Sequence, residues 1–175
     1  TEVSIFQDVR EDAPMKLKLI AIFAAALGAI GDARFAWAAK DFTSDDIMVA
    51  EGIAPLIANS NVDELEKLGN NLIDTKERLP DGRWKLDAFT KAFDLATPES
   101  KEPLYSQIVK LMEKWRAAYP NSRVAPVVLA HLYQRRAFNL RGGGFADEVW
   151  KENWDPFFEH LKKAKAALVK SKKTA

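Results

Sequence analysis

The sequence predicts an all-α fold of about six helices packed in antiparallel pairs. Apolar residues recur every three or four positions in successive segments between residues 47 and 168. Proline, glycine and short polar residues separate these segments, and no stretch of convincing length alternates as a β-strand would. Hydrophobic residues make up 47% of the chain and charged residues 29%. This composition is typical of a folded globular domain rather than a disordered chain.

The first helix is predicted within Asp41–Ser60. Ser44 or Asp45 is the expected N-cap, because short polar side chains accept hydrogen bonds from the free N–H groups at a helix start. Pro55 lacks an N–H donor and is expected to kink this helix. Its apolar face carries Ile47, Ala50, Ala54 and Ile57.

The second helix is predicted to begin after Asn61 and to reach about Arg78. Asn61 and Glu64 have the spacing of a capping box, in which each residue bonds the other's backbone N–H. The connection between the first two helices is only residues 58–60, and such a short link favours an antiparallel pair.

The middle of the chain is predicted to hold a turn and two further helices. Leu79–Gly82 should form the turn, because proline fixes φ and glycine accepts a positive φ. Asp87 is the expected cap of a short helix, and Thr97 followed by proline should start the next. Trp84 and Trp115 are expected to pack into the core.

A central helix is predicted to follow Ser122 as its N-cap and to end at Arg141 and Gly142–Gly144. Pro126 falls in its first turn, where a missing donor is tolerated. Its apolar residues form two stripes, which predicts a helix buried between neighbours. The second stripe consists of Val124, Val127, His131 and Phe138.

The final helix is predicted to begin with Asp155 as its N-cap and Pro156 in its first turn. One face is apolar and the other is rich in lysine. The lysine face could contact anionic lipid or another acidic surface, although a solvated face explains it equally simply.

The N-terminal residues have the pattern of a secretory signal peptide at 15–38. Met15–Lys18 is basic, Leu19–Ile30 is uncharged and apolar, and Ala36–Ala38 has the small residues of a cleavage site. Residues 1–14 are interpreted as upstream sequence that is not native. Residues 39–175 would then form one α-helical domain, periplasmic or secreted in a bacterium. A buried core helix or an uncleaved anchor is the alternative for this apolar run.

Several motifs resemble those of a bacterial family known only as a domain of unknown function. They are Gly82-Arg83-Trp84-x-Leu86, Trp115-x4-Pro120-x-Ser122-x2-Ala125, Ala130-x2-Tyr133 and Arg141-Gly142. The resemblance implies an often exported fold whose helix pairs are similar to those of tetratricopeptide proteins. It implies no activity. No strict repeat of about 34 residues is visible, so the chain is repeat-like at most.

The composition argues against several classes of function. The formal net charge is +1, which gives no basic field for nucleic acid. The chain contains no cysteine, which excludes disulfides and thiolate chemistry. His131 and His160 are the only histidines, and neither has a second ligand at metal spacing. No metal or cofactor is expected, and the absence of a nucleophile motif makes an enzyme the less favoured interpretation.

Four basic residues form one candidate site for a small molecule or anion. Arg135, Arg136 and Arg141 could bind phosphate or carboxylate, and His131 could be a functional histidine beside them. However, the glycines beside Arg141 end a helix, whereas phosphate-binding loops begin one. Alternatively, Arg141 could satisfy the last carbonyls of its helix or pair with a carboxylate, and His131 could be a hydrogen-bonded, partly buried histidine.

Trp150 and Trp154 form the other candidate site, in the connection after the glycines. They could line a groove or anchor a partner, or they could pack in the core. The favoured hypothesis is a module that binds a protein or peptide through a groove between helix pairs, near the central helix, Arg141 and these tryptophans. The alternatives are a pocket at the basic residues, possibly of an enzyme, and an accessory domain without a site of its own.

Overall fold

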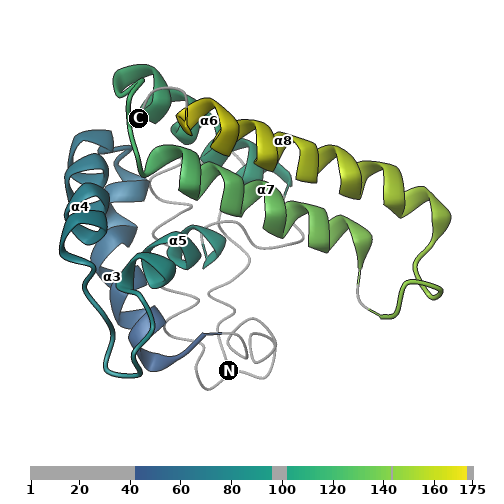
Figure 1. Cartoon of the computed structure of the whole chain (residues 1–175), viewed down its shortest axis with the longest axis horizontal. Coiled ribbons are helices and arrows are strands. Elements are labelled where there is room, and N and C mark those ends of the chain that lie inside the picture. Colours follow the sequence, from purple (N-terminus) through teal and green to yellow (C-terminus); the bar gives the residue numbers. More distant parts are fainter. Residues whose placement is uncertain (1–41, 96–101, 143, 173–175) are drawn as a thin grey trace, which may run out of the picture.

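The computed structural model describes residues 42–95, 102–142 and 144–172. Within these ranges the chain forms six α-helices and a single 3₁₀ turn, with no β-strand, which confirms the all-α prediction (Figure 1). The elements are α3 (Ser44–Ala58), α4 (Val62–Thr75), α5 (Lys85–Leu95), α6 (Glu102–Ala118), α7 (Ala125–Arg141), η2 (Lys151–Asn153) and α8 (Trp154–Lys172). The predicted signal peptide at 15–38 and the predicted helix start at Thr97 lie outside the described residues.

The starts of three helices differ slightly from those predicted. Thr43, rather than Ser44 or Asp45, is the N-cap of α3, because its hydroxyl accepts the N–H of Asp46 at 3.2 Å while the carboxylate of Asp46 accepts the N–H of Thr43 at 3.0 Å. Helices α5 and α8 begin at Lys85 and Trp154, so Asp87 and Asp155 lie in their first turns. An acidic side chain there still favours the helix dipole without being the cap.

Helix α4 ends earlier than predicted and leads into a tight turn. Lys76 takes a left-handed conformation with φ of 50°, which ends the helix at Thr75 instead of near Arg78. The turn at Leu79–Gly82 is confirmed: Gly82 has φ of 86° and donates its N–H to the carbonyl of Leu79 at 2.9 Å. A single antiparallel bridge joins residues 78 and 84, and it leaves Trp84 42% exposed. The expectation that Trp84 packs inward is therefore wrong.

The core lies where α3, α4, α5, α6 and the first half of α7 meet. Three buried rings from α5 and α6 pack together at its centre: Phe93 meets Phe89 edge to face at 5.7 Å and stacks on Trp115 at 6.3 Å, centroid to centroid. Gly69 of α4 lets the start of α7 approach closely, because a Cβ there would lie 2.5 Å from a methyl group of Val124. The prediction that Trp115 is a core residue is confirmed.

Helices α7 and α8 form an antiparallel hairpin whose far end extends beyond the other helices (Figure 1). The first half of α7 is buried as predicted. Its second half is not enclosed, and Phe138 of the predicted buried stripe is exposed. The described contacts of α5 and α6 with α7 reach Arg135, which lies near Asp94, and Arg136, which lies over the ring of Tyr105. Further along, Phe138 meets Phe157 of α8 edge to face and stays 46% exposed.

Candidate functional site

The motif from Trp115 to Ala125 forms a buried polar network around one glutamate. The carboxylate of Glu66 accepts the indole N–H of Trp115 at 2.7 Å and the hydroxyl of Ser122 at 2.6 Å. Asn70 donates to its other oxygen at 2.6 Å. The Ser122 oxygen also accepts the N–H of Ala125 at 2.9 Å. The network joins α4, the end of α6 and the start of α7, so this motif stabilises the fold and is not an exposed site.

Ser122 therefore has a different position from the one predicted. Val124 is the N-cap of α7 and makes no side-chain cap bond. Ser122 lies two residues earlier, yet it satisfies the first free N–H of the helix while it donates to Glu66. Sequence analysis missed Glu66, because an acidic residue in an amphipathic helix is usually solvated.

The Gly82-Arg83-Trp84 motif also serves the fold. Arg83 donates to the buried carboxylate of Asp46 at 2.9 Å and to Asp81 at 2.7 Å, while Lys91 lies 3.9 Å from Asp46. Burial by itself would raise the pKa of Asp46. The hydrogen bonds from the Thr43 N–H and from Arg83, together with the charge of Lys91, outweigh it, and the pKa of Asp46 lies below its ordinary value.

The structure divides the four predicted basic site residues among three partners. His131 and Arg135 both contact Asp94 of α5, whose carboxylate oxygen lies 2.9 Å from the His131 Nε2 and 3.4 Å from the Arg135 Nε. The Arg136 guanidinium instead lies 5.0 Å from the ring centroid of Tyr105. His131 and Arg135 are brought together, as members of an acid–base cluster between α5 and α7.

The fourth basic residue, Arg141, lies at the far end of the hairpin. Its guanidinium lies 5.5 Å from the ring centroid of Trp154 and donates to the carbonyl of Gly144 at 3.2 Å. Gly142 has φ of 82° and donates its N–H to the carbonyl of Phe138, which confirms the predicted glycine end of the helix. The carbonyls that Arg141 contacts belong to Gly142 and Gly144 of the loop, and not to the last turn of its helix as the alternative expected.

An aromatic cluster occupies the same end of the hairpin, and we call its residues the aromatic end. Trp154 stacks on Phe158 with centroids 5.7 Å apart, and Phe157 meets both Trp154 and Phe138 edge to face. Exposure is high: Phe145 is 78% exposed, Trp150 is 73% exposed and Phe158 is 50% exposed. The aromatic end comprises Phe138, Phe145, Trp150, Trp154, Phe157 and Phe158.

Trp150 is thus not a core residue, whereas Trp154 is half-buried. The loop that carries Phe145 is held by its own contacts, since the Glu148 carboxylate accepts the N–H of Phe145 at 2.8 Å. Asn153 donates to the carbonyl of Arg141 at 3.3 Å and joins the two ends of the loop. The prediction that Phe138 lies in a buried stripe is wrong, because helical periodicity does not reveal where a neighbouring helix stops.

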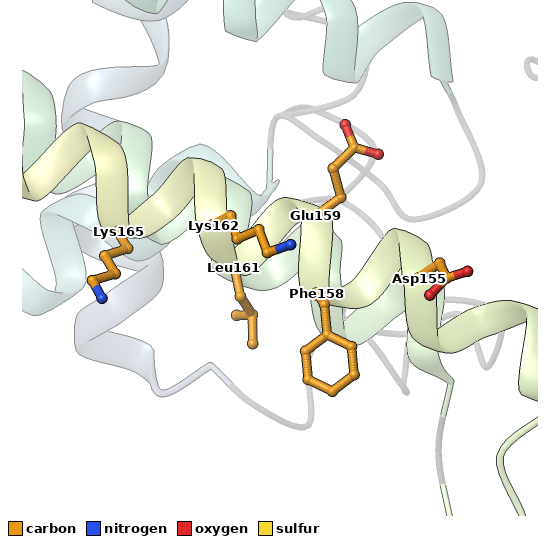
Figure 2. A pocket seen from close by; sticks show the side chains of 6 residues that line it. All are labelled: Asp155, Phe158, Glu159, Leu161, Lys162 and Lys165. Carbon is orange, nitrogen blue, oxygen red and sulfur yellow. The ribbon is translucent and has the colours of Figure 1, made fainter.

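A surface hollow of about 520 Å³ lies along α8, next to the aromatic end. Figure 2 shows Phe158 and Leu161 side by side on one flank of the helix, with Lys165 a turn further along. Its lining residues are Asp155, Phe158, Glu159, Leu161, Lys162 and Lys165. The basic residues His131, Arg135, Arg136 and Arg141 are not among them.

Within the described ranges, no group of three or more His, Asp or Glu side chains is placed to hold a metal ion. Of the described helices, none combines the length and the apolar composition needed to cross a bilayer. Comparison with known protein families, curated proteins and solved structures finds no match to the chain. The resemblance to an exported helical family and the tetratricopeptide-like pairing stay predictions.

Proposed function

We propose that this protein is a binding module that engages a protein or peptide partner through the aromatic end of the α7–α8 hairpin. The observation that carries the proposal is the gathering of exposed aromatic rings on one projecting end of the molecule. Large exposed apolar patches are rare on monomeric proteins and mark interaction sites. Tyrosine, tryptophan and phenylalanine are also the residues that dominate the buried centres of interfaces.

The arrangement of the aromatic end suits recognition. Stacking on Phe158 holds the Trp154 ring, and the hydrogen bond from the Phe145 N–H to Glu148 holds the backbone of the loop, so less freedom is lost at these two points on binding. Arg141, stacked on Trp154, adds a charged group at the rim of the patch. The predicted site residues Arg141, Trp150 and Trp154 belong to this surface, while Arg135, Arg136 and His131 do not.

An anion pocket at the basic residues is the weaker alternative. Asp94 already engages His131 and Arg135, so an anion binding there would meet a carboxylate. The proposed setting for the partner is the bacterial periplasm or the exterior. It rests on the signal-peptide pattern of residues 15–38.

The test is site-specific photo-crosslinking in cells that produce the full chain. A photoreactive phenylalanine analogue at Phe145, the most exposed ring of the aromatic end, is expected to capture a partner. The matched control carries the analogue at Met48, which is also largely exposed but lies on α3. The Trp150→Ala/Phe158→Ala variant should lose the crosslink, because truncating an interface anchor costs about 2 kcal/mol or more, a weakening of about thirtyfold. Equal capture from Phe145 and Met48 would refute the proposal.

A further inference from the structure

The hollow along α8 has an ordered distribution of charge. Figure 2 shows Asp155 at one end, Phe158 and Leu161 in the apolar middle and Lys165 at the other end, with the side chain of Lys162 turned toward Glu159. The hollow and the aromatic end share Phe158, so the two surfaces are continuous. A partner held at the aromatic end can therefore extend along α8.

The charges at the two ends of the hollow are available to a partner. Lys162 and Lys165 form no ion pair with any residue that the structure describes, and the same holds for Asp155. Glu159, in contrast, is paired with Lys163 at 2.7 Å, which lowers the pKa of Glu159. The charge of Lys162 also contributes to the lowered pKa of Glu159. The charged groups without a described ion pair are thus Asp155 at the start of the hollow, Lys162 beside Glu159, and Lys165 at the far end.

From this arrangement we infer that the partner segment is apolar and acidic, and that it lies along α8 with its acidic side chains on Lys162 and Lys165. The Cβ atoms of residues three positions apart on a helix lie about 5–6 Å from each other, and the long lysine side chains that start there can turn toward a common partner. Acidic residues three or four positions apart on a partner helix have the same separation. Asp155 favours a basic or uncharged residue at the other end of the segment, which gives the complex one orientation. This inference rests on the proposed function and specifies its partner class.

The shape and charge of the surface favour a peptide over a membrane. An anionic bilayer presents one continuous sign of charge, which a surface containing Asp155 and Glu159 beside its lysines would oppose. A concave hollow also fits a side chain or helix better than a flat lipid surface. Residues 155–165 extend over about 15 Å of helix, which a partner helix covers in about ten residues.

The test uses a phage library of random peptides of about twelve residues, selected on the full chain, with selected peptides then measured by fluorescence anisotropy. Enriched peptides should carry acidic pairs three or four positions apart beside aromatic or aliphatic residues. The Lys162→Glu/Lys165→Glu variant should bind them at least about tenfold more weakly, and added salt should weaken binding to the wild type. Peptides whose acidic residues are replaced by lysine should prefer this variant.

The matched control is Lys67→Glu/Lys114→Glu, which makes the same charge change on α4 and α6 and should alter affinity by less than about twofold. The inference would be overturned if the enriched peptides lacked acidic pairs. It would also be overturned if they bound the Lys162→Glu/Lys165→Glu variant and the control variant with equal affinity. If they still required Trp150 and Phe158, the proposed function would stand. A selection that enriches no peptide at all would refute the proposed function itself. Lysine-dependent binding only to phosphatidylglycerol–phosphatidylcholine vesicles would overturn the inference in favour of a membrane.

Discussion

Removal of the Glu66 carboxylate is the sharpest test of how the fold is held together. Glu66→Ala takes away the acceptor for the Trp115 indole and the Ser122 hydroxyl, both in a buried setting. A hydrogen bond to a charged group contributes about 1.5–3 kcal/mol, and an unsatisfied buried donor costs about 1–3 kcal/mol. Because Ser122 can rotate toward another acceptor, we expect a loss of about 3–5 kcal/mol in the free energy of unfolding.

Two further variants make the prediction specific. Glu66→Gln keeps an oxygen acceptor and nearly the same volume, so it should cost only about 1 kcal/mol. Glu64→Ala removes an exposed glutamate from the same helix, whose only described ion pair is a 3.9 Å contact with Lys67, and should change stability by less than about 0.5 kcal/mol. The buried carboxylate, rather than helix propensity, would then explain the difference.

The measurement is urea unfolding followed by circular dichroism, with the slope compared between variants to check that the unfolded states are alike. The expected loss is a large part of the 5–15 kcal/mol that holds a typical domain together. A cost for Glu66→Ala of less than about 1 kcal/mol, or a cost equal to that of Glu64→Ala, would refute the view that this network locks α4 to the start of α7.

Three other predictions follow from single contacts. Because Asp46 has a lowered pKa in the fold, its stabilisation is complete above its ordinary pKa of 3.8 and is lost as pH falls toward the lowered value. The urea midpoint of unfolding should therefore fall less between about pH 5 and pH 3 in the Asp46→Asn variant than in the wild type. Equal falls in the two proteins would contradict this. Gly69→Ala should destabilise by about 1–3 kcal/mol in thermal unfolding because its Cβ would meet Val124, whereas Gly52→Ala, with open space around it, should stabilise by about 0.5–1 kcal/mol. Trp150→Ala should leave the melting temperature nearly unchanged, since this side chain is mostly exposed; a large drop would show that it packs in the fold.

The fold class and most local structure were predictable from the sequence by itself. The spacing of apolar residues defines the helices, and local chemistry defines the turn at Gly82 and the end of α7 at Gly142. These features depend on residues within one or two turns of each other. The errors at helix ends are also local, because several neighbouring polar residues can serve as the cap. In α3, Thr43 caps the helix together with Asp46, in place of the predicted Ser44.

The candidate site was only partly predictable, because it depends on which helices end where. Trp150 and Trp154 were identified from their position after the glycines, but whether Trp150 is exposed depends on how far the hairpin extends beyond α5 and α6. Helical periodicity records the side of a helix that is apolar, and it does not record whether a neighbour covers that side. Only the tertiary structure decided that Phe138 and Phe158 are exposed.

Contacts with distant segments also explain why Glu66 is buried while the other acidic residues of α4 are exposed. Its sequence neighbourhood is that of a solvated glutamate, and its burial follows from Trp115 and Ser122, about fifty residues away in the chain, which meet it when α6 and α7 pack on α4. The sequence by itself determined an all-helical domain with a conspicuous aromatic segment. Tertiary packing decided which polar residues hold the helices together and which rings stay exposed, because both outcomes depend on contacts between distant segments.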